Sequence, residues 1–139
     1  MSNGNSKVKT LAIAALLAAI ICIATTSFHI PVGVNGGYVH VGDAFIYMAA
    51  SILPLPYAMM AAAIGAGLVD LLSGAAVWVI PTIIIKPILV LFFTSKNEKI
   101  LCKRNVLAVL LAGFTGVMLY CLAEYIMYGN FIAAFYMNF

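Results

Sequence analysis

The chain has 139 residues, of which 65% are hydrophobic and 8% are charged, and its net charge is +3. Because soluble domains have about 25% charged residues and disorder requires low hydrophobicity, this composition excludes an ordinary soluble globule and a disordered chain. The three cysteines form no C-x-x-C pair, which argues against a disulfide scaffold. The small net charge argues against a nucleic-acid-binding protein.

An integral membrane protein with about five or six spans remains, since each helical span needs about 20 apolar residues. After a polar start with Lys7 and Lys9, the first apolar run is Thr10–Phe28, which is long enough to cross the bilayer. A cleaved secretory signal peptide is the alternative, but no clear cleavage motif follows the run. The sequence before Cys22 also fits a lipoprotein anchor poorly. We therefore expect a retained first helix.

The remaining segments alternate between apolar runs and turn residues. His29–Gly37 is rich in Gly, Pro and Asn and is predicted to be a loop. Prolines 54 and 56, the Ser-Gly pair at 73–74 and the Gly-Asn pair at 129–130 separate the later runs. Further helices are predicted over Tyr38–Leu53, Tyr57–Leu72, Ala75–Thr94 and Val106–Tyr128, with the start of a sixth at Phe131–Phe139.

The last stretch has nine residues and is too short to span a bilayer. We expect it to be a sixth helix cut short by truncation of the chain, with an interfacial or re-entrant tail as the alternative. The predicted fold class is therefore all-α: an integral membrane protein with a bundle of five transmembrane helices plus the start of a sixth. Residues 1–139 are expected to form a single transmembrane domain.

The basic residues predict the orientation in the membrane. One cluster, Lys7 and Lys9, precedes the first predicted helix, and a second cluster lies at residues 96–104, between the fourth and fifth. Four spans separate the clusters, so both fall on one side, which the positive-inside rule assigns to the cytoplasm. We expect a multi-pass protein of the cell membrane with a cytoplasmic N-terminus, and with His29–Gly37 facing outward.

Four ionisable residues fall within or at the ends of the predicted spans: Asp43, Asp70, Lys86 and Glu124. Charges inside a bilayer are costly, so such groups usually face a partner or a wet cavity. At 1.5 Å of rise per residue, the three acids lie toward the outer half of the membrane and Lys86 lies near its middle. This arrangement predicts a cavity that opens outward. Asp70 and Lys86 can alternatively form a structural ion pair.

Aromatic rings share helix faces with these charges. Residues four apart lie on one face of a helix, and three such stripes combine an ionisable group with a ring. The stripes are Asp43, Tyr47 and Ser51; Trp78, Thr82 and Lys86; and Tyr120, Glu124 and Tyr128. Rings and charges together suit a pocket for a small flat polar molecule. The alternative is that the rings belong to the interfacial aromatic belt.

Several kinds of chemistry are absent from the sequence. There is no G-x-x-x-x-G-K-[ST] motif, so active transport needs a partner ATPase or an ion gradient. No nucleophile–base constellation indicates an enzyme. His29, His40 and Asp43 make at most a weak metal site. We therefore expect no metal and no cofactor.

Three segments, Gly37–Phe45, Gly65–Gly74 and Pro81–Lys86, together resemble the S components of energy-coupling factor (ECF) vitamin transporters. The riboflavin-type group and its relatives for thiamine precursors and pyridoxine-like compounds are the most similar. The resemblance implies a six-helix protein that binds a vitamin on the outer side. It also implies docking on a membrane scaffold (T) subunit that carries a pair of cytoplasmic ATPases.

The resemblance also implies roles for particular residues. In the family, an A-x-x-x-A surface on the first helix meets the scaffold. Here the pair is either Ala14 and Ala18 or Ala15 and Ala19. The first outer loop closes over the ligand, and the pocket draws on the outer parts of later helices, which points to Trp78, Glu124, Tyr128 and Asn130.

The sequence thus predicts high-affinity capture of a flat heterocyclic vitamin of flavin, pyrimidine or pyridoxine type. The alternatives are a stand-alone ion-coupled transporter and a structural membrane protein. The candidate substrate-binding residues are Asn35, Tyr38, His40, Asp43, Tyr47, Asp70, Trp78, Lys86, Tyr120, Glu124, Tyr128 and Asn130.

Overall fold

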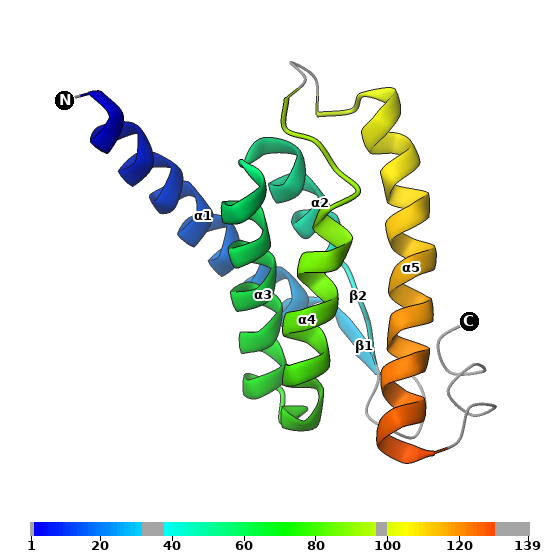
Figure 1. The fold of residues 1–139 in the computed structure, drawn as a ribbon. Helices are drawn as coiled ribbons and strands as arrows, with labels where there is room; N and C mark the ends of the chain where they lie inside the picture. The colour runs from blue at the N-terminus through cyan, green and yellow to red at the C-terminus, as the bar shows by residue number, and fades with distance from the viewer. Residues whose placement is uncertain (1, 32–37, 97–99, 130–139) are drawn as a thin grey trace.

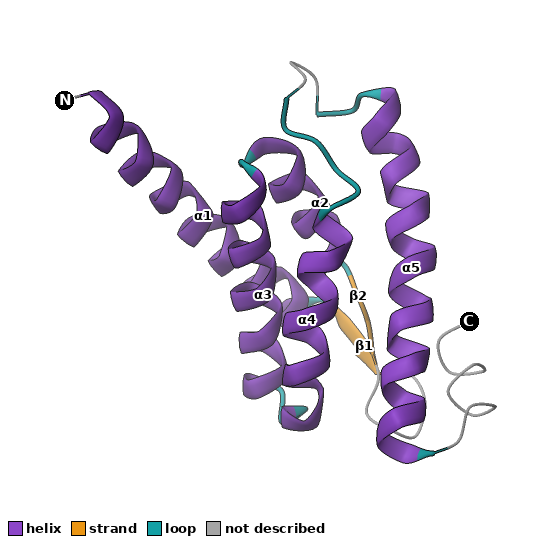
Figure 2. Cartoon of the chain, viewed as in Figure 1, coloured by secondary structure: helices purple, strands orange, loops and turns teal. Residues whose placement is uncertain are grey.

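The computed structural model describes residues 2–31, 38–96 and 100–129. Over these residues the chain is a bundle of helices with one short β-hairpin (Figures 1 and 2). The elements are α1 (Ser2–Ser27), β1 (His29–Pro31), β2 (Tyr38–His40), α2 (Gly42–Ile52), α3 (Leu55–Leu72), the 3-10 helix η1 (Ala76–Trp78), α4 (Val79–Val90) and α5 (Lys103–Tyr128).

Three helical segments in the described part of the chain are long and apolar enough to cross a membrane: Gly4–Ser27, Leu55–Leu72 and Lys103–Tyr128. The apolar stretch Ala76–Val90 is helical but shorter. Helix α1 begins eight residues before the predicted start at residue 10, because polar residues continue the helical hydrogen bonding beyond the apolar run. The count of five or six spans stays a prediction.

The second predicted helix is wrong at its start. Tyr38–His40 forms strand β2, which pairs antiparallel with β1 so that His29 lies opposite His40. Tyrosine and β-branched Val39 favour a pleated strand, and α2 begins only at Gly42. The hairpin adds two short strands to an otherwise helical chain, and it corrects the prediction that the loop starts at residue 29. Residues 32–37 of that loop lie outside the described residues.

The fourth predicted helix, 75–94, is also wrong as one continuous helix. It consists of the 3-10 helix η1 followed by α4, which ends at Val90. Pro81 is tolerated in the first turn of α4, but Pro87 lies inside the helix and removes one of its hydrogen bonds. Beyond Val90, the amides of residues 91–93 donate to carbonyls three residues earlier, which tightens the end of the helix.

The predicted turns at 73–74 and 129–130 contain the two described glycines with positive φ, Gly74 at 81° and Gly129 at 72°. Residues other than glycine rarely adopt this backbone conformation. Gly74 turns the chain between α3 and η1. Gly129 ends α5, and its amide donates to the carbonyl of Tyr125 at 2.8 Å.

Helix α3 packs closely against α1 (Figure 1). Ala14 and Ala18 of α1 are buried, as are Ala61 and Gly65 of α3. A methyl group on Gly65 would lie 2.8 Å from the Ala18 carbonyl oxygen and 2.9 Å from Cβ of Ile21. Small residues here let the two backbones approach closely, which is how helices associate in an apolar solvent.

The two basic clusters lie at the same end of the bundle. Figure 1 shows the N-terminal end of α1 and the start of α5 at the top of the view, and the turns after α3 and α5 at the bottom. Lys7 and Lys9 belong to α1, and Lys103 and Arg104 open α5. This is the arrangement that the predicted topology requires. Its orientation across the membrane stays a prediction.

Candidate substrate-binding site

An ion pair joins α2 to α4 at the centre of the candidate site. Nζ of Lys86 lies 2.6 Å from Oδ1 of Asp43, a residue 43 positions away in the sequence. The Lys86 side chain is 4% exposed and that of Asp43 is 34% exposed, so the two ends of the pair differ in their access to the surroundings. The ion pair that the sequence suggested as an alternative was between Lys86 and Asp70, whereas the structure pairs Lys86 with Asp43.

Tyr120 of α5 completes a polar and aromatic cluster around the pair. Nζ of Lys86 lies 5.1 Å from the centre of the Tyr120 ring, within the range of a cation–π contact. The Tyr120 hydroxyl lies 3.2 Å from Oγ1 of Thr82, one turn before Lys86 on α4. The ring of Trp78 is tilted by 49° to that of Tyr120, with centres 6.0 Å apart. Residues from all three predicted stripes therefore meet here.

Two further acids, Asp70 and Glu124, are buried in the bundle. Glu124 lies one turn after Tyr120 on α5, and Asp70 lies near the end of α3. Buried acids in membrane helices usually mark ligand or ion sites, because their burial in an apolar medium is costly. The sequence predicted both as candidate site residues. Tyr128, by contrast, is exposed at the end of α5.

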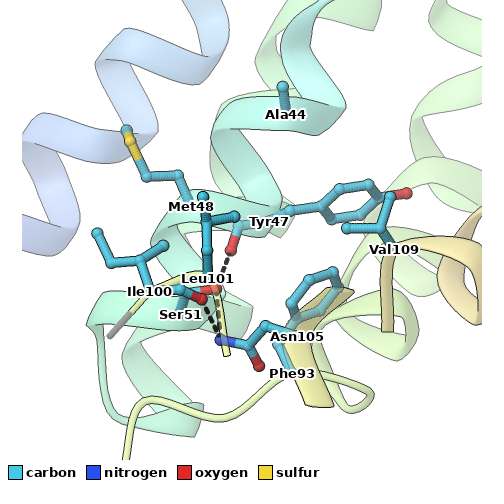
Figure 3. A pocket seen from close by; sticks show the side chains of 9 residues that line it. All are labelled: Ala44, Tyr47, Met48, Ser51, Phe93, Ile100, Leu101, Asn105 and Val109. Carbon is cyan, nitrogen blue, oxygen red and sulfur yellow. Dashed lines mark hydrogen bonds between the residues drawn. The ribbon is translucent and has the colours of Figure 1, made fainter. Parts of the chain in front are cut away.

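Tyr47 links the cluster to a cavity further along α2. It lies one turn after Asp43, and its ring stacks on that of Phe93 with centres 4.8 Å apart and planes 21° apart. Tyr47 lines a cavity of about 270 Å³ between α2, α5 and the segment around residue 100, and Figure 3 shows its side chain among the other wall residues. The cavity is lined by Ala44, Tyr47, Met48, Ser51, Phe93, Ile100, Leu101, Asn105 and Val109.

Asn105 lines this cavity and takes part in a hydrogen-bond network. Its Nδ2 lies 3.1 Å from Oγ of Ser51, 2.9 Å from the Ile100 carbonyl and 3.1 Å from the Thr94 carbonyl. Its Oδ1 accepts a hydrogen bond from the Thr94 amide at 3.0 Å. The buried amide thus ties α5 to α2 and to the segment after α4 (Figure 3).

A family model for the ECF-type riboflavin transporter, S component, matches residues 5–139. The chain belongs to this family. Searches of curated proteins and of solved structures returned no match. Membership confirms the resemblance found in the sequence. An ECF S component is a vitamin-binding subunit of a membrane transporter and not an enzyme.

Four candidate residues of this S component are joined by contacts through Lys86 and Tyr120. They are Asp43, Trp78, Lys86 and Tyr120. Tyr38 and His40 lie in β2 by their backbone. Their side chains, together with Asn35 and Asn130, lie outside the described residues. The weak metal site also requires undescribed His side chains, and the described residues contain no group of three His, Cys, Asp or Glu placed to hold a metal.

Sequence reasoning missed Phe93 and Asn105. Phe93 was assigned to a continuous helix, whereas it lies beyond the end of α4 and its ring stacks on that of Tyr47. Asn105 was left out of the predicted helix Val106–Tyr128, although it stands at the start of α5, next to an apolar run. The available signal was an amide side chain next to an apolar run. Such an amide, when buried, needs hydrogen-bond partners.

The structure separates the two alanine pairs proposed for scaffold docking. Ala14 and Ala18 are buried against α3, whereas Ala15 and Ala19 are exposed on the outer face of α1. In this S component, Ala15 and Ala19 are therefore the small-residue pair that a partner helix can reach. A role in docking stays a prediction for both pairs.

Proposed function

We propose that this S component captures a riboflavin-type flavin on the outer side of the membrane. The observation that carries the proposal is the convergence of Asp43, Lys86, Tyr120 and Trp78 in a chain of the riboflavin-type S-component family. A flavin offers a flat apolar ring face and a polar edge with donors and acceptors. The cluster offers the complementary groups, two aromatic rings beside a buried ammonium and a carboxylate.

The spacing of the two rings limits how such a ligand can bind. A sandwiched ring would need about 3.5 Å on each side, or about 7 Å in total, whereas the centres of Trp78 and Tyr120 are 6.0 Å apart and tilted. The flavin therefore stacks on an outer face of one ring rather than between the two. In that position its polar edge can reach Lys86 and Asp43, and the ion pair opens or tilts to receive it.

The transport step is supplied by other subunits in this proposal. The chain contains no P-loop motif, so ATP hydrolysis belongs to a pair of cytoplasmic ATPases joined to the S component by the scaffold subunit. The exposed pair Ala15 and Ala19 is the proposed docking surface on α1. The basic end of the bundle faces the cytoplasm, which directs the turns at Gly74 and Gly129 outward.

Calorimetric titration of the purified full-length protein tests the capture role. Riboflavin is titrated in detergent beside thiamine and pyridoxine, and we expect one saturable site that prefers riboflavin. Tyr120→Leu removes the ring that contacts both Lys86 and Trp78, and should weaken binding about tenfold. Phe114→Leu is the matched control, because Phe114 is exposed on the same helix. Equal affinity in both variants contradicts the site assignment.

The buried acids Asp70 and Glu124 are also compatible with a stand-alone ion-coupled transporter. Vesicle uptake separates the two functions. Uptake that requires the scaffold and ATPases together with ATP supports the proposed function. Uptake by this chain alone, driven by a proton or sodium gradient, supports the ion-coupled transporter.

A further inference from the structure

The cavity in Figure 3 contains few of the polar groups that a vitamin site needs, and it extends along α2 from Ala44, next to Asp43, to Ser51. Apart from Asn105, Ser51 and the Tyr47 hydroxyl, its walls are apolar side chains. The Asn105 amide and the Ser51 hydroxyl already bond to each other. An open apolar cavity of this kind, facing a bilayer, suits a hydrocarbon chain better than water or a polar solute.

Exposed apolar side chains extend the cavity to the surface. Leu101 is 81% exposed, and Ile100 and Val109 are also exposed, so the cavity is open to the surroundings of α5. These residues lie at the basic end of the bundle, next to the start of α5 (Figure 1). In the predicted topology, the cavity therefore lies at the boundary between the hydrocarbon and the headgroups, on the side of the membrane where the basic residues gather.

Two exposed basic residues lie next to the wall residues in the chain. Lys103 and Arg104 stand between the wall residues Leu101 and Asn105, and both are exposed. Residues 96–104 contain four basic side chains and one acidic side chain in all. A basic patch next to an apolar slot at the cytoplasmic interface is the pattern that recognises anionic lipid headgroups.

We propose that this cavity is a binding site for an anionic phospholipid of the inner leaflet. One acyl chain occupies the cavity between α2 and α5, and the phosphate lies against Lys103 and Arg104. The proposed scaffold surface, Ala15 and Ala19, is on α1, which lies on the opposite side of the bundle from α5 in Figure 1. Lipid at this site is therefore compatible with docking of the scaffold, and Tyr47 in the cavity wall connects the site to the vitamin cluster.

Native mass spectrometry of the full-length protein tests this site. The protein is exchanged into micelles or nanodiscs containing phosphatidylglycerol or phosphatidylcholine with identical acyl chains, and the retained lipid is counted. We expect one tightly held phosphatidylglycerol and no equivalent phosphatidylcholine. Lys103→Ala with Arg104→Ala should weaken retention about 25-fold, since each basic residue contributes about fivefold. Lys7→Ala with Lys9→Ala removes the same charge from α1 and should leave retention within about twofold.

A second pair of variants tests the cavity itself. Val109→Trp fills the cavity from α5 and should abolish retention, whereas Leu110→Trp adds the same ring at an exposed neighbouring position that does not line the cavity. Inorganic phosphate should not displace the lipid. The proposal is overturned if the two lipids are retained equally, or if Val109→Trp and Leu110→Trp behave alike. It is also overturned if Val109→Trp spares lipid retention but prevents copurification with the scaffold. Riboflavin affinity should be unchanged in the variant Lys103→Ala with Arg104→Ala, which separates this proposal from the vitamin site.

Discussion

The Asp43–Lys86 pair should respond unequally to the loss of each partner, because its two ends are buried to different degrees. In Asp43→Asn the Lys86 ammonium, 4% exposed, keeps its charge without its carboxylate. Breaking a buried ion pair from one side costs about 3–5 kcal/mol. The contact of Lys86 with the Tyr120 ring remains and offsets part of this cost. We expect the free energy of unfolding to fall by about 3 kcal/mol.

Lys86→Met should be milder. It removes the buried charge and leaves the Asp43 carboxylate, which is 34% exposed and can be hydrated or screened. We expect a loss of about 1 kcal/mol. The double variant should lose about 1–2 kcal/mol, which gives a coupling free energy of about 2–3 kcal/mol from the double-mutant cycle.

The assay is reversible unfolding of the full-length protein in mixed micelles, followed by the fluorescence of Trp78, the one tryptophan of the chain. Equal losses in Asp43→Asn and Lys86→Met would show that burial does not govern the pair. A coupling free energy near zero would show that the pair contributes nothing to the fold. Either result refutes the reasoning from burial.

Three further predictions concern packing, the cavity and docking. Gly65→Ala should cost about 1–3 kcal/mol of unfolding free energy, because its methyl group meets the backbone of α1. Gly113→Ala, with nothing within 4 Å, should be neutral or stabilise α5 by up to about 1 kcal/mol. Asn105→Ala should lose about 2–3 kcal/mol in the same assay, since the Ser51 and backbone groups it serves stay buried. Ala15→Leu should leave riboflavin affinity unchanged and abolish copurification with the scaffold and ATPases. Ala14→Leu should instead destabilise the bundle, and the reverse outcome would assign docking to the buried pair.

Much of the helical layout follows from hydropathy and turn residues. The predicted helices at 57–72 and 106–128 lie within α3 and α5, extended by two or three residues at their start. The glycine turns fall where predicted, because positive φ at residues 74 and 129 is a local requirement. The basic clusters lie at one end of the bundle, as the even number of predicted spans between them requires.

The errors arise where tertiary pairing decides. Residues 38–40 are apolar enough for a helix, and only pairing with residues 29–31 makes them a strand. The end of α4 at Val90 cannot be read from hydropathy, since the apolar run continues through Phe93.

The candidate site shows the same division. Helical spacing identified Asp43, Lys86 and Tyr120 as members of ring-and-charge stripes. The partner of Lys86 depends on how α2 crosses α4, so the sequence offered Asp70 where the structure places Asp43. Asn105 was missed because its partners, such as Ser51, are far away in the sequence.

Quenching of Trp78 by riboflavin in the full-length protein is the most direct test of the central claim. Trp78 lies beside Tyr120 in the proposed site, and flavins accept energy from a nearby indole. Titration with riboflavin should quench Trp78 emission saturably at one equivalent, and Tyr120→Leu should shift the curve about tenfold to weaker binding. A folded protein whose Trp78 emission does not change across the titration would contradict a flavin site at this cluster.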